Sequence, residues 1–187
     1  MTTSLELPEG LPVPEDDGGA AHLAGMKMPR VELLSTSGGI VDVAKLPGCT
    51  VLYIYPMTGR PDRELPAGWD EIPGARGCTP QSCSFRDHFA ELKELGVAQV
   101  YGLSTQDTDY QREAKERLHL PFELLSDSNF KLGDVMRLPY FEVDGVRLFK
   151  RMALILDGAN IRHVFYPVFP PDRNAGDVVA WLRENNA

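Results

Sequence analysis

Three apolar runs do most to limit the folds open to this chain. They lie at residues 50–55, 99–103 and 152–156. Each is rich in Val, Ile, Leu or Tyr and lacks the regular alternation with polar residues that marks a half-exposed strand. Such runs predict strands buried on both faces, as in the centre of an α/β sheet. Pro56 ends the first run, and Asp157-Gly158 predicts a hairpin turn into a further strand at 161–165.

Helical patterns separate these strands. Apolar residues recur at helical spacing in four places: at Phe85, Phe89, Leu92 and Leu95, at Tyr110, Ala114 and Leu118, at 130–136, and at 177–183. Gly96 is a suitable stop for the first pattern, and Asp107 with Thr108 a suitable start for the second. The order of elements predicts an α/β fold in which helices flank a mixed central β-sheet.

Two segments do not fit this alternation. Residues 1–24 hold three prolines and the acidic run 15–17, and they bury too little apolar surface to offset their ordering entropy. We therefore expect a flexible acidic N-terminal tail, followed by one domain over residues 25–187. Residues 59–75 form a Pro/Gly-rich insertion within that domain. Loops of this length are usually either functional or disordered.

Charge and cysteine content exclude several classes of protein. The net charge of −8 disfavours a nucleic-acid partner, and no apolar run approaches the length needed to cross a bilayer. The first residues lack the basic and apolar regions of a secretory signal, so the expected location is cytoplasmic. Three cysteines are not a disulfide framework here, and the odd number leaves at least one without a partner in the chain.

The segment 77–87 carries the clearest chemical signal. It reads Gly-Cys-Thr-Pro-Gln-Ser-Cys-Ser-Phe-Arg-Asp and opens a predicted helix. Whether Gly77 or Thr79 is the cap, Cys78 faces unpaired backbone N–H groups and the positive end of the helix dipole, which favour a thiolate. Arg76 and Arg86 are close enough in sequence to add to this effect. Cys78 is therefore a candidate nucleophile.

Cys83 follows Cys78 by five positions. On an intact helix the two Cα atoms would lie about 8–9 Å apart, given 1.5 Å of rise and 100° of turn per residue. A disulfide needs roughly 4.4–6.8 Å. Either the two cysteines are unrelated, or the first turn of the helix unwinds during function.

The motif at 77–87 resembles that of the peroxiredoxins, most closely their bacterioferritin-comigratory or Q-type branch. Segments 28–33, 120–127 and 151–157 resemble other parts of the same family. The resemblance implies a thioredoxin-like fold and a thiol-dependent peroxidase that reduces hydrogen peroxide and organic hydroperoxides. It assigns no metal, flavin or haem. The implied partners are the hydroperoxide and a thioredoxin- or glutaredoxin-type reductant, with the protein a monomer or homodimer.

The resemblance also implies roles for single residues. Cys78 would attack the peroxide and become a sulfenic acid, and Cys83 would resolve it as an intramolecular disulfide. Arg151 would hold the thiolate and stabilise charge on the breaking O–O bond, and Pro56 would shield Cys78 from water.

One position departs from the family pattern. The family has a threonine three residues before its reactive cysteine, where this chain has Ala75. Our hypothesis is that Thr58 supplies the missing hydroxyl and that the 59–75 loop forms a lid or a partner surface. In the alternative, Thr58 only caps the turn, and backbone N–H groups position the peroxide.

Two other functions compete with peroxidase activity. A thiol–disulfide oxidoreductase on the same fold is disfavoured because the chain has no Cys-x-x-Cys. A non-catalytic thioredoxin-like module would instead use the 59–75 loop for binding. Cys49, beside a predicted strand, is expected to be a small buried core residue. The histidines show no metal-ligand spacing.

Overall fold

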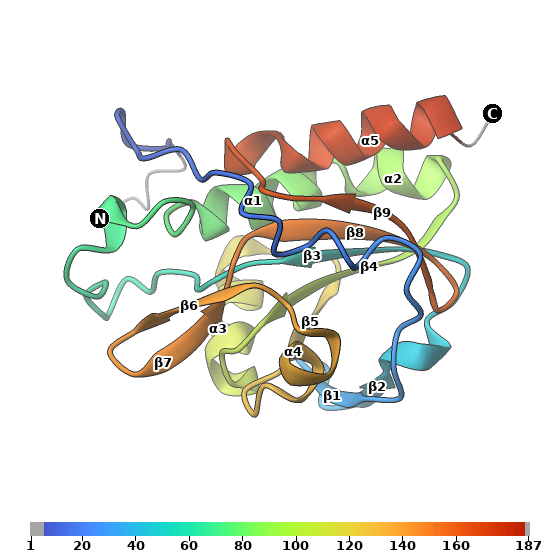
Figure 1. Ribbon diagram of the computed structural model, residues 1–187, viewed down its shortest axis with the longest axis horizontal. Helices are drawn as coiled ribbons and strands as arrows, with labels where there is room; N and C mark the ends of the chain where they lie inside the picture. The colour runs from blue at the N-terminus through green and yellow to red at the C-terminus, as the bar shows by residue number, and fades with distance from the viewer. Residues whose placement is uncertain (1–5, 186–187) are drawn as a thin grey trace.

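The computed structural model describes residues 6–185, which form a seven-stranded mixed sheet with helices on both faces (Figure 1). In spatial order the strands are β2 (Ile40–Asp42), β1 (Glu32–Ser35), β5 (Glu123–Ser126), β4 (Val97–Ser104), β3 (Cys49–Ile54), β8 (Met152–Asp157) and β9 (Asn160–Phe165). A separate hairpin pairs β6 (Tyr140–Val143) with β7 (Val146–Phe149). The predicted α/β class with a mixed sheet is confirmed.

The three apolar runs occupy the centre of the sheet, as predicted. β3 runs parallel to β4 and antiparallel to β8, and both of its faces are buried. Its alternate residues enter two different cores. Leu52 and Ile54 pack in one core, and Val51 and Tyr53 pack in the other. The predicted hairpin is also present, because β8 pairs antiparallel with β9 across the turn at Gly158.

The helices divide between these two cores. The core that contains Tyr53 lies under α1 (Cys78–Asp87), α2 (Phe89–Glu94), α5 (Asn174–Asn185) and the end of α3 (Thr108–Leu118). The opposite core holds α4 (Lys131–Met136) and the 3-10 turn η1 (Val43–Lys45). Figure 1 shows α1, α2 and α5 along one side of the sheet. This arrangement sets the N-terminus of α1 against the end of β3.

The first helical pattern forms two helices instead of one. α1 ends at Asp87 and α2 begins at Phe89, with His88 outside helical geometry between them. The His88 ring contacts the Ser84 carbonyl at 2.9 Å and so competes with the backbone for that acceptor. Gly96 ends the second helix with a φ of +86°, the left-handed conformation expected of a glycine stop.

The prediction of a solvated tail over residues 1–24 is wrong for part of the described segment. Leu23 is fully buried and Ala20 nearly so, both in the core under α4. The chain then pairs with β9 and the turn before it: the backbone N–H of Gly25 donates to the Ile161 carbonyl and that of Met28 to the Ala159 carbonyl. The expectation rested on the acidic composition of the segment. It did not account for Ala20 and Leu23, which become buried when the segment packs against this core. The expectation for residues 1–5 lies outside the described residues.

The 59–75 loop packs against the rest of the domain. It contains the 3-10 turn η2 (Trp69–Glu71), and the Trp69 side chain is buried against Leu148 and Phe141 of the β6–β7 hairpin. Its start is tied down as well, because Arg117 of α3 donates to the Gly59 carbonyl at 2.9 Å. Within residues 6–185, no helix has both the length and the apolar character needed to cross a bilayer.

Candidate active site

The site is built around the first turn of α1. Gly77 is the N-cap residue and Cys78 the first helical residue, which decides between the two caps that the sequence allowed. Gly77 has a φ of +108°, and a Cβ there would overlap Pro171 of the 3-10 turn η3 (Pro171–Arg173). Only glycine fits this close approach, and it brings Cys78 to the positive end of the α1 dipole.

Two N–H groups point at the Cys78 sulfur. The Met57 backbone N–H lies 3.4 Å from Sγ, and Arg151 Nη2 lies 3.3 Å from it. As a thiol, Cys78 can donate to the Ala75 carbonyl at 3.7 Å. The residue is only 3% exposed. Its surroundings therefore offer a thiolate two donors, one of them cationic, at a buried position.

Arg151 is a buried cation with neutral partners. It is 3% exposed, and Nη2 is shared between the Cys78 sulfur and three backbone carbonyls, those of Gly74, Ala75 and Arg76, each at 3.1 Å. Among the ion pairs of residues 6–185, none involves this guanidinium. An unpaired buried charge is costly, so a thiolate at Cys78 is the counter-charge that this arrangement favours.

Sequence reasoning missed Gln81, which positions Arg151. The Gln81 Oε1 accepts from Arg151 Nη1 at 2.6 Å, and its Nε2 donates to Asn174 Oδ1 of α5 at 2.9 Å. Gln81 is fully buried. Its place one helical turn after Cys78 was the available signal, because residues three apart share a helix face.

The hydroxyl of Thr58 has Gln106 as its hydrogen-bond partner. Thr58 is buried, and both its backbone N–H and its Oγ1 contact Gln106 Oε1, at 3.1 and 3.4 Å. Its carbonyl accepts from the Tyr110 hydroxyl at 2.8 Å. Among the hydrogen bonds of the described chain, those to Cys78 Sγ come instead from Met57 and Arg151. This geometry favours the alternative in which backbone N–H groups do the positioning.

Pro56 and the strand before it hold this backbone in place. Pro56 is buried two residues after the end of β3, between Tyr55 and Met57. Tyr53 of β3 donates to Ser82 Oγ of α1 at 3.0 Å, and its ring stacks on Phe85 at 4.5 Å. The end of β3 and the start of α1 are therefore fixed to each other. The Met57 N–H reaches the sulfur for that reason.

The other two cysteines lie outside this cluster. Cys83 is on the same intact helix as Cys78 and is 4% exposed, so ideal helix geometry keeps the two Cα atoms about 8–9 Å apart. Burial raises the pKa of Cys83, while the charge of Arg86 works against that increase. The Arg86 guanidinium donates to Asp87 and to the Leu118 carbonyl. Cys49 at the start of β3 is only partly buried, and burial raises its pKa as well.

A pocket of about 300 Å³ opens beside Cys78. Its walls combine the start of α1, the turn after β3, part of the 59–75 loop and the N-terminal segment at Glu6 and Leu7. Arg76 lines it too, although its guanidinium pairs with Asp70 at 2.9 Å instead of reaching the sulfur. Cys78 thus has access to a volume far larger than one water molecule, which takes about 30 Å³ in the liquid.

Comparison with known proteins shows the family to which the chain belongs. The Redoxin family model matches residues 23–179. The putative peroxiredoxin bcp of Coxiella burnetii is 32% identical over 165 residues, which cover 84% of this chain and 97% of that protein. The chain is a member of the peroxiredoxin family.

Plant relatives of this peroxiredoxin are longer. The putative chloroplastic peroxiredoxin Q of Oryza sativa subsp. indica is 30% identical over 161 residues, which are 85% of this chain but only 66% of the rice protein. Among solved structures, peroxidoxin BcpB from Mycobacterium tuberculosis superposes with a TM-score of 0.70 at 24% identity, covering 88% of this chain and 98% of that one. The likeness establishes the thioredoxin-like peroxiredoxin fold.

Proposed function

We propose that this protein is a thiol peroxidase that reduces hydrogen peroxide and organic hydroperoxides. The observation that carries the proposal is the pairing of Cys78 at the start of α1 with Arg151, a buried cation that has no carboxylate partner among the described residues. The Cys78 thiolate attacks the terminal oxygen of the hydroperoxide. The O–O bond breaks, the sulfur becomes a sulfenic acid, and an alkoxide or hydroxide leaves and takes a proton.

Each neighbour of Cys78 has a part in this step. Arg151 and the Met57 N–H stabilise the thiolate before attack and the charge on the breaking O–O bond during it. Pro56 limits the access of water to the sulfur. Thr58 acts indirectly, since its contacts with Gln106 hold the Met57–Thr58 backbone.

Cys83 completes the cycle in this scheme. Its thiol condenses with the Cys78 sulfenic acid, which forms a disulfide and releases water. Because both cysteines lie on α1, its first turn must unwind before the sulfurs can bond. An external dithiol of the thioredoxin or glutaredoxin type then reduces the disulfide by exchange. We propose a cytoplasmic location, where such dithiols are kept reduced, and a monomer or homodimer.

The decisive experiment follows peroxide consumption by the reduced protein. We expect about one equivalent per chain in a rapid burst, and sustained turnover once a thioredoxin system is added. Cys78→Ser should abolish both, because a serine hydroxyl is scarcely ionised near neutral pH. Cys49→Ser is the matched control and should retain both. Turnover by Cys78→Ser, or no burst in the wild type, would overturn the proposal and favour an oxidoreductase or a binding module.

A further inference from the structure

The N–H that Met57 offers to Cys78 belongs to an irregular stretch of backbone. Residues 56–60 follow β3 and form neither a helix nor a strand. The hydrogen bonds of a helix or a sheet therefore do not set the direction of this N–H, although its 3.4 Å contact with the sulfur depends on that direction. A donor that stabilises developing charge has to be aimed before the reaction begins. Contacts elsewhere on this stretch must supply that aim.

Three side chains hold the three peptide units that follow this N–H. Gln106 Oε1 accepts from the Thr58 backbone N–H at 3.1 Å. The Tyr110 hydroxyl donates to the Thr58 carbonyl at 2.8 Å, and Arg117 Nη2 donates to the Gly59 carbonyl at 2.9 Å. Each peptide unit is a rigid plane, so fixing these units restricts the backbone rotations that could turn the donor away from the sulfur.

Tyr110 makes the central one of these contacts from a packed face of α3. Tyr110 and Arg117 are seven positions apart, so they share one side of the helix. The guanidiniums of Arg60 and Arg63 lie near the Tyr110 ring, at 5.3 and 5.7 Å from its centroid. Burial raises the pKa of the Tyr110 hydroxyl, which therefore stays protonated and able to donate at neutral and mildly alkaline pH.

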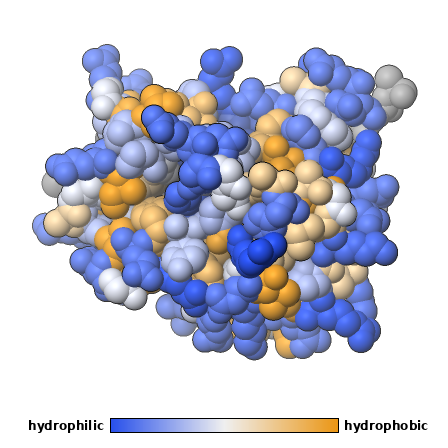
Figure 2. Space-filling model, viewed as in Figure 1, coloured by the Kyte–Doolittle hydropathy of each residue, from blue (hydrophilic) through white to orange (hydrophobic). Residues whose placement is uncertain are grey.

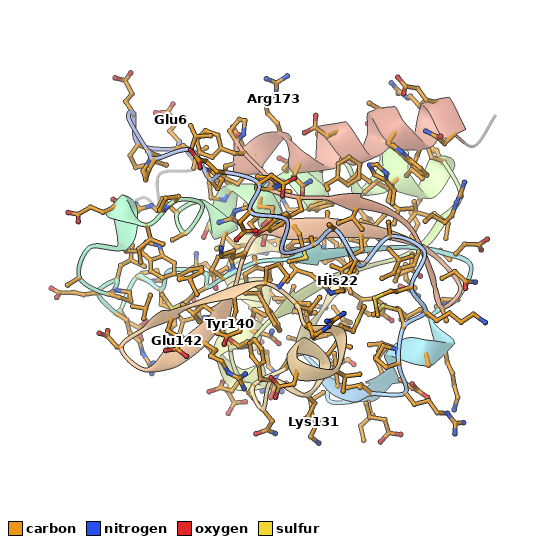
Figure 3. All side chains as sticks on the ribbon, viewed as in Figure 1. Glu6, His22, Lys131, Tyr140, Glu142 and Arg173 are labelled. Carbon is orange, nitrogen blue, oxygen red and sulfur yellow. The ribbon has the colours of Figure 1, made fainter. Side chains whose placement is uncertain are left out.

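Gln106 is fixed independently of the segment that it holds. It lies in the turn between β4 and α3 and is 8% exposed. The hydroxyl of its neighbour Thr105 donates to the carbonyl of Arg147 in the β6–β7 hairpin at 2.9 Å. In Figure 3 the labelled Tyr140 and Glu142 mark strand β6 of that hairpin. The side chain of Gln106 thus starts from a turn that the rest of the fold keeps in place.

We propose that Tyr110 is a positioning residue for the reaction with peroxide: through the Thr58 carbonyl it keeps the Met57 N–H on the Cys78 sulfur. Gln106 acts with it, through the Thr58 N–H. In the described part of the chain neither side chain bonds to the sulfur, so both act through the backbone. This inference rests on the peroxidase activity proposed above and adds the residues that aim one of its two donors.

Tyr110→Phe tests the proposal because it keeps the ring and removes only the hydroxyl. We expect the oxidation of Cys78 by hydrogen peroxide to slow by about threefold to tenfold, the usual effect of one lost hydrogen bond. The thiolate absorbance near 240 nm should also develop at a higher pH. The later condensation with Cys83, seen in stopped flow as a phase independent of peroxide concentration, should keep its wild-type rate, because that step depends on the unwinding of α1.

Two further variants complete the test. Gln106→Met removes the acceptor of the Thr58 N–H and should give the same pattern as Tyr110→Phe. Tyr166→Phe is the matched control, since it also removes a tyrosine hydroxyl that donates, here to Asp17 at 2.7 Å, and it should behave as the wild type.

The outcomes separate this inference from the proposed function. Wild-type oxidation and titration of Cys78 in Tyr110→Phe or in Gln106→Met would overturn the inference. The same holds if Tyr166→Phe slows the oxidation as much as Tyr110→Phe does, or if Tyr110→Phe slows both phases equally. If the wild type shows no phase that depends on peroxide concentration, the peroxidase proposal itself fails.

Discussion

At the scale of single residues, the site depends on how a buried charge is balanced. Arg151 lies in the protein interior, and its contacts are backbone carbonyls, an amide and one sulfur. A nearby carboxylate would neutralise Arg151 and compete with the thiolate. The neutral Gln81 avoids this competition while still fixing the guanidinium. Gln81 is therefore a positioning residue in the proposed reaction.

Gln81→Met should slow the reaction with peroxide by roughly tenfold or more, because it leaves Arg151 Nη1 without its acceptor in a buried place. Stopped-flow oxidation of Cys78 and the thiolate absorbance near 240 nm are the measurements. Gln111→Met, also fully buried but hydrogen-bonded to Ser104 and Leu125, is the control for lost stability alone. An unchanged thiolate absorbance in Gln81→Met would contradict the positioning role.

Gly77→Ala should displace the start of α1. Its φ of +108° disfavours any side chain, and the new Cβ would overlap Pro171 and approach Leu7 within 3.0 Å. We expect a loss of stability above the 1–2 kcal/mol of left-handed strain, together with slower oxidation of Cys78. Gly96→Ala is the matched control, since Gly96 has a φ of +86° with open space around it. Equal effects of the two variants on oxidation would refute the close-packing argument.

At the scale of elements, the proposed cycle requires α1 to adopt two geometries. In the reduced protein it is an intact helix, with the Gln81 N–H bonded to the Gly77 carbonyl and Tyr53 bonded to Ser82. The disulfide requires those turns to open. Burial raises the pKa of Cys83, so its thiol stays protonated while the helix is folded. Unwinding would therefore both shorten the distance and expose the resolving thiol.

Peroxide treatment of the wild type should accelerate amide hydrogen exchange in α1 at residues 78–86 and leave α3 unchanged, because a Cys78–Cys83 bridge cannot coexist with the intact first turns. Mass spectrometry should identify that bridge within one chain. Cys83→Ser should be oxidised to the sulfenic acid without the faster exchange. A bridge found only between chains, or unaltered exchange in oxidised wild type, would rule out this route.

At the scale of the whole molecule, segments distant in sequence close the site together. The N-terminal segment crosses the front of the molecule to reach β1 and contributes Leu7 and Glu6 to the pocket (Figure 1). Asp17 bonds to Lys150 and Tyr166, and the Lys150 contact holds the pKa of that carboxyl well below its usual range. The surface in view in Figure 2 is largely hydrophilic, with separate apolar patches. Because Leu7 lines the pocket and Asp17 bonds to Lys150 and Tyr166, the N-terminal segment is part of the domain.

Leu23→Ala should destabilise the protein by about 2–5 kcal/mol in urea unfolding, the usual cost of truncating a fully buried leucine. Leu34→Ala makes the same change in β1 at a side chain that is 53% exposed, so its cost should stay below about 1 kcal/mol. A loss below about 1 kcal/mol for Leu23→Ala would mean that the segment is only loosely docked.

The sequence by itself determined the central strands and the place of Cys78. Apolar runs have one burial state that suits them, and either of the two caps that the sequence allowed, Gly77 or Thr79, places Cys78 at the start of the helix. The short strands β1 and β5 were not predicted, because their local sequence does not favour a strand. β1 and β5 both read Glu-Leu-Leu-Ser, and two of these residue types are good helix formers. Their antiparallel pairing with each other decides their conformation.

Only the tertiary structure decided what surrounds the sulfur. Arg151, which only the family resemblance had named, stands 73 positions from Cys78, and Gln81, which had not been named, meets Asn174 across 93 positions. Local spacing carries no information on such contacts, because they follow from how α1, β8 and α5 pack on one sheet. The partners of Thr58 and Met57 follow from the same packing: Gln106, from the turn after β4, accepts from the Thr58 hydroxyl, and the Met57 N–H contacts the Cys78 sulfur. Strand order and helix packing set those distances.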